Sequence, residues 1–480
     1  MTGPLSQRFL LAGLAFATVN LTSCGSLGLN ARKSSELPQT NSSLDGARGV
    51  GMAIFRSTAV ASLRQPVTTT KLGFALFYQR MRAMLRVNDS PPVLETQPSE
   101  IPGSPEFEHL LDHHGIRHAG SGTLAFLVNG SSFYPDFEKE VAHARKSIDV
   151  QVYIFDNDDA AVHCADLLKA RSGEIPVHVL CDDMGTTIAQ TAAPDTPAPA
   201  GFTPPAEIVD YLREGSRVKV RRALNPWLVS DHTKLFVFDH ERAYLGGMNI
   251  GREYRSEWHD LMARVEGPIV SPLQREFTRA WRKAGPWGDL ALIRNPIHRD
   301  PPPLRSGIPL RILRTDTVVG RYDVLKATRY AIRASRKRIW VENPYFAADD
   351  IEDELVAAAR RGVDVRVILP KRGDSTIMDT ANLAAARHLM AAGVKVIRYP
   401  GMTHMKVMMC DGWATFGSAN LDTLSMRINR ELNLAFTDPK TIKALENAVF
   451  VPDFKRSTPL RKEETDGVIV PLVQSVARQL

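Results

Sequence analysis

Short apolar runs and longer amphipathic stretches alternate along the middle of the chain. The apolar runs have the length of buried strands, and they fall at Ser147–Phe155, Pro176–Cys181, Val218–Arg222, Lys234–Asp239, Ala243–Leu245 and Leu261–Val265. Helical patterns accompany them at Phe133–Arg145, Ala160–Arg171, Pro205–Glu214 and Ser271–Lys283. Strands that alternate with helices predict a mixed or parallel sheet that is covered by helices.

The same order of elements then occurs a second time. Strand-like runs recur at Arg338–Glu342, Val363–Leu369, Val394–Tyr399, Lys406–Asp411, Ala414–Phe416 and Leu432–Phe436, and helical patterns at Asp349–Arg361 and Thr380–Ala392. We therefore predict an α/β fold of two duplicated halves, residues 120–285 and 309–450, which meet across a pseudo-twofold interface. The proline-rich residues 286–308 would link the halves, and residues 451–480 would form a C-terminal tail.

The first 24 residues are typical of a secretory signal. Arg8 supplies a positive charge, and the apolar run Phe9–Val19 is shorter than a membrane-spanning helix. The ending Leu21-Thr22-Ser23-Cys24 resembles a bacterial lipobox, in which cleavage leaves Cys24 as a lipidated N-terminus. An ordinary signal peptide and a short anchor helix are the alternatives. We expect an exported lipoprotein of the cell envelope, held at the outer membrane or the periplasmic face by its acyl chains.

Residues 25–105 are expected to be a tether and linker, because residues 25–70 are rich in Ser, Thr, Gly and Asn and residues 88–105 are rich in Pro. One amphipathic helix is predicted inside this region, at residues 72–87. Its apolar stripe either packs on the neighbouring domain, which is the more common arrangement, or lies on an anionic membrane surface.

Composition sets only mild bounds on function. The chain has 480 residues, a formal net charge of +7 and 44% hydrophobic residues, so it has ample material for a core and favours anionic partners such as phospholipid headgroups or nucleic acid. The three cysteines after Cys24 are an odd number, which argues against a disulfide framework. No Cys/His cluster has zinc spacing, and we predict no metal site and no cofactor.

One motif occurs twice, once near the end of each half. Its form is H-x-K-x4-D followed by a glycine-rich turn and an asparagine, and its two copies are His232, Lys234, Asp239 and Asn249, then His404, Lys406, Asp411 and Asn420. Alternation along a strand puts the His and the Lys of each copy on the same face. Two facing copies would make a pocket of two His, two Lys and two Asn. That set suits a phosphate diester, because the Lys and Asn side chains can hold its oxygens while one His attacks and the other protonates the leaving alcohol.

With this duplicated motif the chain resembles the phospholipase D superfamily over roughly residues 120–450. Within it the chain is most similar to the bacterial cardiolipin synthase group, as judged from the stretches 147–155, 258–260, 267–268, 344–346, 361–365 and 417–432. The resemblance implies a two-step reaction through a phosphohistidine, without a metal. Of the two histidines we assign His232 as nucleophile and His404 as general acid and base, and the resemblance implies a more structural role for Asp239 and Asp411.

A second acidic pair follows from the same chemistry. Asp260 and Glu431 stand at the same offset after the asparagine of their motif copy. A nucleophilic imidazole needs an acceptor at its far nitrogen, and the superfamily uses acidic residues at this place, so we predict that these two carboxylates hold the histidines. Surface charge in a loop is the alternative. Ser418 is a further candidate for contact with the substrate, and Gly247 occupies its place in the first copy.

The acceptor of the phosphatidyl group decides the reaction. Phosphatidylglycerol as acceptor makes a cardiolipin synthase, water makes a phospholipase D, and a DNA substrate makes a nuclease. An inactive lipid-binding scaffold is the non-enzymatic alternative. We expect transfer between phospholipids by a single chain at a membrane surface, without nucleic acid, because a lipid anchor would hold the site there and the sequence has no aromatic-interleaved basic groove. Many cardiolipin synthases carry N-terminal membrane helices, and the predicted lipid anchor is a departure from that pattern.

Overall fold

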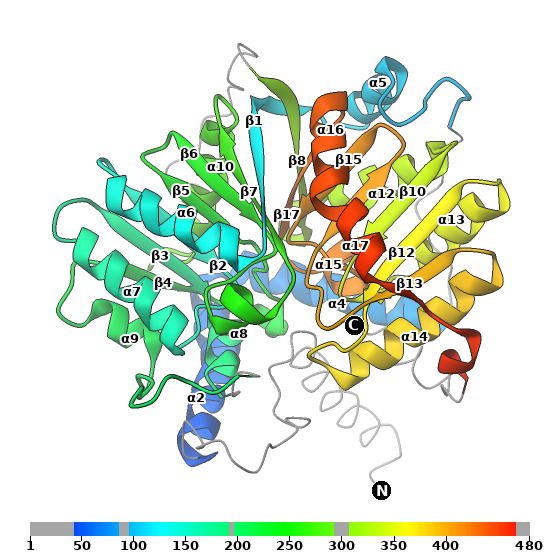
Figure 1. The fold of residues 1–480 in the computed structure, drawn as a ribbon. Helices are drawn as coiled ribbons and strands as arrows, with labels where there is room; N and C mark the ends of the chain where they lie inside the picture. Colours follow the sequence, from blue (N-terminus) through cyan, green and yellow to red (C-terminus); the bar gives the residue numbers. More distant parts are fainter. Residues whose placement is uncertain (1–42, 86–95, 192–195, 292–306, 467–480) are drawn as a thin grey trace, which may run out of the picture.

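The computed structural model describes residues 43–85, 96–191, 196–291 and 307–466, and Figure 1 shows two similar halves joined along one sheet. The first half-sheet has the strand order β4-β3-β2-β5-β6-β7-β1. Its strands are β1 (His118–Val128), β2 (Ile148–Val152), β3 (Val177–Asp182), β4 (Lys219–Ala223), β5 (Leu235–Phe238), β6 (Arg242–Gly246) and β7 (Leu261–Glu266). The strands β2, β3 and β4 are parallel to one another, and the remaining neighbours pair antiparallel.

The second half-sheet repeats this arrangement with the order β13-β12-β10-β14-β15-β17-β8. Its strands are β8 (Ile308–Asp316), β10 (Arg338–Glu342), β12 (Asp364–Pro370), β13 (Lys395–Tyr399), β14 (Val407–Cys410), β15 (Trp413–Gly417) and β17 (Glu431–Phe436). The outer strands β1 and β8 pair antiparallel and join both half-sheets into one. The predicted duplication and α/β class are therefore confirmed.

Helices cover both faces of this sheet and enclose three hydrophobic cores. The outer face of the first half packs against α6 (Gly130–His143), α7 (Asp159–Arg171) and α9 (Ile208–Arg213), and that of the second half against α12 (Asp323–Ala334), α13 (Asp349–Arg360) and α14 (Thr376–Ala391). The third core contains buried side chains of both halves together with α10 (Val270–Lys283) and α16 (Pro439–Leu445). Because the halves share this core, their motif strands are held in a fixed relation.

The sequence analysis missed the two strands that join the halves. The segment of β8 carries Arg311, which is only 1% exposed, and a charged residue of this kind hides the strand pattern. Arg311 is buried because it donates to carboxylates of Glu108 and Asp112 on α5 (Pro105–His113). The ion pairs offset the cost of burying a guanidinium, but their partners lie about two hundred residues away.

The expected tether is wrong from Ser43 onward. That segment forms α2 (Ser43–Phe55), the short helix η1 (Arg56–Val60), α3 (Ala61–Arg64) and α4 (Pro66–Leu85). The last of these includes most of the helix predicted at residues 72–87 and begins earlier than expected, with Pro66 at its first position, where a missing N–H costs nothing. The signal segment, Cys24 and residues 86–95 lie outside the described residues.

The expected C-terminal tail is also partly folded. Residues after 450 form α17 (Val451–Arg456) and β18 (Thr458–Pro459), which pairs antiparallel with the edge strand β13. Burial of Leu460 holds this pairing in place. Of the linker predicted at 286–308, residues 292–306 lie outside the described part of the chain, and the last residue already belongs to β8.

The described cysteines, Cys164, Cys181 and Cys410, are buried and free of disulfides, as core residues are. Burial raises the pKa of the Cys181 thiol to about 12, so it is inert at neutral pH. No helix among the described residues combines the length and the apolar character that crossing a membrane requires.

Candidate active site

The two motif copies meet at the interface between the halves. His232 lies just before β5 and His404 just before β14, and both are almost fully buried. The His232 backbone N–H donates to Arg430 of the second half at 2.9 Å, and the His404 N–H donates to His259 of the first half at 2.7 Å. Each motif is thus joined by a short parallel bridge to the segment of the other half that carries a carboxylate.

The two histidines are held by carboxylates in a crossed arrangement. His232 Nδ1 lies 3.1 Å from Glu431 Oε2 and 3.0 Å from the Ser418 carbonyl oxygen, while His404 Nδ1 lies 2.7 Å from Asp260 Oδ2. The Ser418 carbonyl oxygen only accepts hydrogen bonds, so His232 Nδ1 carries the proton and His232 Nε2 presents its lone pair. The sequence predicted the holding carboxylates, and the structure shows that each belongs to the half opposite its histidine.

Burial keeps both imidazoles uncharged. The pKa of His232 and that of His404 lie well below the usual range, first because both rings are buried and then because the Lys234 and Lys406 ammonium groups are close. Burial also raises the pKa of Asp260 to about 7 and that of Glu431 to about 8, although both lysines oppose this. Each histidine and its carboxylate therefore form a pair that holds or releases a proton near neutral pH.

The two lysines occupy equivalent positions. Lys234 Nζ donates to the backbone oxygen of His232 at 2.8 Å, and Lys406 Nζ donates to that of His404 at 2.6 Å. Both are almost fully buried, and the charge of each reaches both histidines, as their lowered pKa values show. The interface thus contains two cations beside two neutral imidazoles, which suits the oxygens of a phosphate diester.

The two asparagines differ in their partners. Asn249 Oδ1 accepts from the Ile154 N–H at 3.0 Å, which turns its amide NH2 outward as a donor. Pro344 holds the place of Ile154 in the second half, two residues beyond β10 as Ile154 is two beyond β2, and a proline has no N–H to donate. Asn420 instead bonds the Asp422 carboxyl group, and its buried Oδ1 has no hydrogen-bond partner among the described residues.

The first copy has Gly247 where the second has Ser418, and the structure explains the exchange. The Ser418 hydroxyl donates to Glu431 Oε2 at 2.5 Å and accepts from the Leu432 N–H at 3.0 Å. At Gly247 a Cβ atom would overlap the carboxylate of Asp260. The shorter Asp side chain therefore requires a glycine beside it, whereas the longer Glu leaves space for a serine.

The aspartates of the motif accept hydrogen bonds from backbone N–H groups. Asp239 accepts from the N–H groups of residues 145–147 at 2.6 to 3.1 Å, and Asp411 accepts from those of residues 336–338 at 2.7 to 3.0 Å. Burial alone would raise the pKa of Asp239, but the three backbone donors bring that pKa below its usual value. Both aspartates anchor the start of a central strand, β2 or β10, and do not bond the histidines.

Three aromatic rings border the histidines. The Tyr153 ring lies edge-on to His232 at 4.9 Å between centroids, and the rings of Tyr254 and Trp258 lie 5.5 and 5.1 Å from His404. The sequence analysis did not assign them to the site. The only signal was the place of Tyr153 and Trp258 in the stretches 147–155 and 258–260, which carried the family resemblance, and Tyr254 lies outside both stretches.

Behind His404, one buried group has ligand atoms close enough together to suit a metal ion, and the sequence analysis did not find it. It consists of His259, Glu342 and Asp453. The His259 ring bonds Asn129 Oδ1 at 2.7 Å and Asp453 Oδ2 at 3.0 Å, and it stacks on Tyr399. These contacts fix the residue next to Asp260, so the group supports the carboxylate that holds His404.

Four further carboxyl groups from both halves lie near one another: Asp156, Asp158, Glu253 and Asp374. Burial raises the pKa of Asp156 to about 8, and burial together with the other three groups raises that of Glu253 well above its usual value. The Lys406 charge reaches Asp374, so this group of carboxyls is close to the motif lysines. A protonated carboxyl group can both donate hydrogen bonds to hydroxyls and accept hydrogen bonds from them.

The family described as "Cardiolipin synthase, PLD-like domain" matches residues 137–281 and 329–449. Cardiolipin synthase A of Pseudomonas aeruginosa (strain PAO1) is 30% identical over 376 residues, which cover 74% of this chain and 72% of that protein. The probable cardiolipin synthase YwiE of Bacillus subtilis (strain 168) is 31% identical over 350 residues, 70% of this chain and 67% of that protein. The crystal structure of a phosphatidylserine synthase from Haemophilus influenzae Rd KW20 shares the fold, with a TM-score of 0.55 at 13% identity over 74% of this chain and 95% of that one.

Proposed function

The chain belongs to the cardiolipin synthase family with phospholipase D-like domains, and we propose that it transfers a phosphatidyl group between phospholipids through a phosphohistidine. The observation that carries this proposal is the crossed pair of histidines, each neutral and each held at Nδ1 by a carboxylate of the other half. Two such histidines can divide the two chemical roles that a double displacement at phosphorus requires.

In the first step His232 Nε2 attacks the phosphorus of one phosphatidylglycerol. The bond to glycerol breaks, and His404 Nε2 gives its proton to the leaving glycerol oxygen while His404 Nδ1 takes the proton of the Asp260 carboxyl group. Lys234, Lys406 and the Asn249 amide hold the phosphoryl oxygens as their charge grows. Glu431 stabilises the positive charge that develops on His232 as its Nε2 forms the new bond.

In the second step His404 takes the proton of an incoming hydroxyl. The deprotonated oxygen attacks the phosphohistidine, and His232 leaves. When the hydroxyl belongs to a second phosphatidylglycerol, the product is cardiolipin and the overall reaction yields one glycerol per cardiolipin. When water enters, the product is phosphatidic acid, and this hydrolysis is the second candidate reaction.

The carboxyl groups beside the site favour an alcohol acceptor over nucleic acid. Asp156, Glu253 and Asp374 can form hydrogen bonds with the hydroxyls of a glycerol headgroup, and the backbone of a DNA strand offers no such hydroxyls. The unpartnered Oδ1 of Asn420 is another acceptor for such a hydroxyl.

Incubation of the full-length protein with phosphatidylglycerol vesicles tests the proposal, with cardiolipin, phosphatidic acid and glycerol measured by mass spectrometry. We expect cardiolipin and glycerol in equal amounts from wild type and neither product from His232→Ala. Phosphatidic acid without cardiolipin would identify a hydrolase. Cleavage of plasmid DNA in a parallel sample that contains a chelator, without turnover of lipid, would contradict the lipid assignment.

The sequence alone supports a proposal on location: the chain is exported, and Cys24 becomes a lipidated N-terminus in the cell envelope. In cells, Cys24→Ala should yield an unprocessed precursor that migrates more slowly and incorporates no labelled fatty acid. Wild-type processing of this variant would rule out the lipoprotein.

A further inference from the structure

The strongly exposed large hydrophobic side chains of the described residues gather in one region. They are Met52, Ile54, Phe55, Leu63, Val67, Phe74, Phe77, Tyr78 and Met81 of the N-terminal helices, and Trp227, Trp287, Leu290 and Val319. The last four belong to segments that touch those helices. The Trp227 indole N–H donates to Thr69, Asp289 beside Trp287 and Leu290 accepts from Thr68, and Lys71 donates to Val318. Scattered exposed apolar residues are ordinary, but a contiguous group marks an interaction surface.

Helix α4 has apolar side chains on its exposed face as well as on its buried face. Its buried stripe contains Thr68, Leu72 and Leu76, and the last two pack against Val229 and residues of α15 (Thr423–Arg427) and its end. At 100° per residue, the opposite stripe consists of Phe74, Phe77, Tyr78 and Met81, which are 71%, 63%, 52% and 37% exposed. A surface helix of a water-soluble protein presents polar residues on that side. The outer stripe of α4 is instead apolar and aromatic.

The charge of the same segment is strongly one-sided. Residues 43–85 contain six basic residues, Arg48, Arg56, Arg64, Lys71, Arg80 and Arg82, and a single acidic one, Asp45. Arg56 is neutralised by an ion pair with Asp183 on α8 (Asp183–Ala189), and the remaining cations far outnumber the one acid. Basic residues beside an exposed apolar stripe complement the negative surface of an anionic bilayer.

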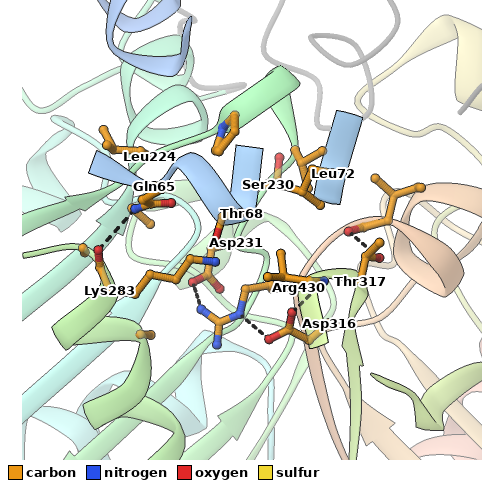
Figure 2. A pocket seen from close by; sticks show the side chains of 17 residues that line it. Gln65, Thr68, Leu72, Leu224, Ser230, Asp231, Lys283, Asp316, Thr317 and Arg430 are labelled. Atoms are coloured by element: carbon orange, nitrogen blue, oxygen red, sulfur yellow. Dashed lines mark hydrogen bonds and ion pairs between the residues drawn. The ribbon is translucent and has the colours of Figure 1, made fainter. Parts of the chain in front are cut away.

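The region lies at the edge of the molecule where the histidines are. Helix α2 packs against α8, which begins where β3 ends, and α4 spans η2 (Pro226–Leu228) of the first half and η4 (Thr317–Val319) of the second. Figure 1 shows α2 at the lower edge of the first half, α8 above it, and α4 running behind the two halves. Beneath α4 a cavity of about 40 Å³ lies between the halves, and Figure 2 shows Gln65, Thr68 and Leu72 above Asp231 and Arg430. Asp231 directly precedes His232, and Arg430 directly precedes Glu431. The cavity has room for only a few waters. Because residues of α4 and the residues next to His232 and Glu431 line the same small cavity, α4 lies close to the catalytic segments.

We propose that the outer face of α2–α4, together with Trp227, Trp287, Leu290 and Val319, docks the enzyme on an anionic phospholipid bilayer. Phe74, Phe77 and Met81 enter the boundary between headgroups and acyl chains, and the neighbouring arginines contact lipid phosphates. The substrate lipid then reaches the histidines along the edge that faces the membrane. The inference rests on the proposed function for its substrate, but it concerns a surface that does not bear the catalytic groups.

The test uses the chain from residue 25 onward, so that neither the signal segment nor an acyl anchor can contribute to binding. Phe74, Phe77 and Met81 are replaced together by Ser, and a matched control replaces the same three by Leu, which keeps the face apolar. Co-sedimentation is measured with vesicles of phosphatidylglycerol and of phosphatidylcholine. Activity is measured on phosphatidylglycerol vesicles and on a short-chain phosphatidylglycerol below its aggregation concentration.

We expect the Ser variant to bind phosphatidylglycerol vesicles at least a hundredfold more weakly and to lose vesicle turnover in proportion. Its activity on dispersed short-chain lipid should stay within threefold of the parent, and the Leu control should bind like the parent. The parent should prefer phosphatidylglycerol vesicles to phosphatidylcholine vesicles at least tenfold.

Equal vesicle binding by the Ser variant and the parent would overturn the inference. A second result would also overturn it: the parent forms dimers, the Ser variant is monomeric, and both bind vesicles equally. That result would identify the face as an interface between two copies of the chain. Absence of turnover in the parent on both lipid forms, with vesicle binding as expected, would refute the proposed function and leave the docking surface standing.

Discussion

Replacing Glu431 by Gln tests the crossed arrangement of the site most directly. The amide keeps the size of the side chain, but it cannot take the negative charge that the carboxyl group adopts 3.1 Å from His232 Nδ1 when the imidazole becomes positive. It also presents an NH2 group that can donate to Nδ1, which favours the tautomer with the proton on Nε2 and blocks the attacking lone pair. Both effects act on the same step, the formation of the phosphohistidine.

The structure allows the electrostatic part to be estimated. Charge centres about 4 Å apart interact by roughly 4 kcal/mol at an effective dielectric of about 20. Glu431 and His232 are both almost fully buried, so water weakens this interaction little. At about 1.4 kcal/mol per decade, loss of the charge should lower kcat roughly 10³-fold, while KM changes little because the charge on His232 develops only during the reaction.

The assay measures cardiolipin formed from phosphatidylglycerol vesicles, with thermal unfolding followed in parallel. A matched control is Glu354→Gln, which removes a buried carboxylate that pairs with Arg329 and Arg333 away from the histidines. This control should lower the melting temperature and leave kcat within threefold of wild type. A kcat for Glu431→Gln within tenfold of wild type would refute the reasoning.

Three other predictions concern the same framework. Gly247→Ser should displace the Asp260 carboxylate, which a Cβ would overlap, and so lower kcat about a hundredfold while circular dichroism stays unchanged; wild-type turnover would show that the carboxylate can move freely. The pair of Asp260 and His404 delivers a proton and loses it as pH rises, so, with the pKa of Asp260 raised to about 7 by burial, the kcat profile should fall above about pH 7, and this limb should disappear in Asp260→Asn. Asp239→Ala removes the acceptor of three backbone N–H groups and should lower the free energy of unfolding by about 2–3 kcal/mol in a urea titration, with kcat of the folded protein changed less than tenfold; an unchanged midpoint would contradict the anchoring role.

Much of the fold was predictable because its signals are local. Strands such as β5 and β14 are uninterrupted apolar runs, and their repetition in the same order indicated the duplication before any contact was known. The strands at the seam were not predictable in this way. Arg311 in β8 is buried only because two carboxylates of α5 reach it, and no window around residue 311 contains those partners.

The packing of the N-terminal helices was also not predictable from the local sequence. Their Gly, Ser and Thr content favours a tether, and no local pattern distinguishes the inner stripe of α4 from the outer one. Leu72 and Leu76 are buried because η2 and α15 supply a surface for them, whereas Phe74 and Phe77 find none. Which apolar stripe packs and which stays exposed depends on the shape of the neighbouring halves.

The sequence by itself determined the chemistry, because each copy of the motif is a local stretch whose residue types have fixed reactivity. Each of the two copies supplies one His, one Lys, one Asn and one carboxylate. Only the tertiary structure decided how they combine. Asp260 holds His404 and Glu431 holds His232 because the bridges at residues 231 and 403 run between the halves. The pKa shifts follow from burial in that interface, and burial is a property of the assembled halves that neither copy of the motif contains alone.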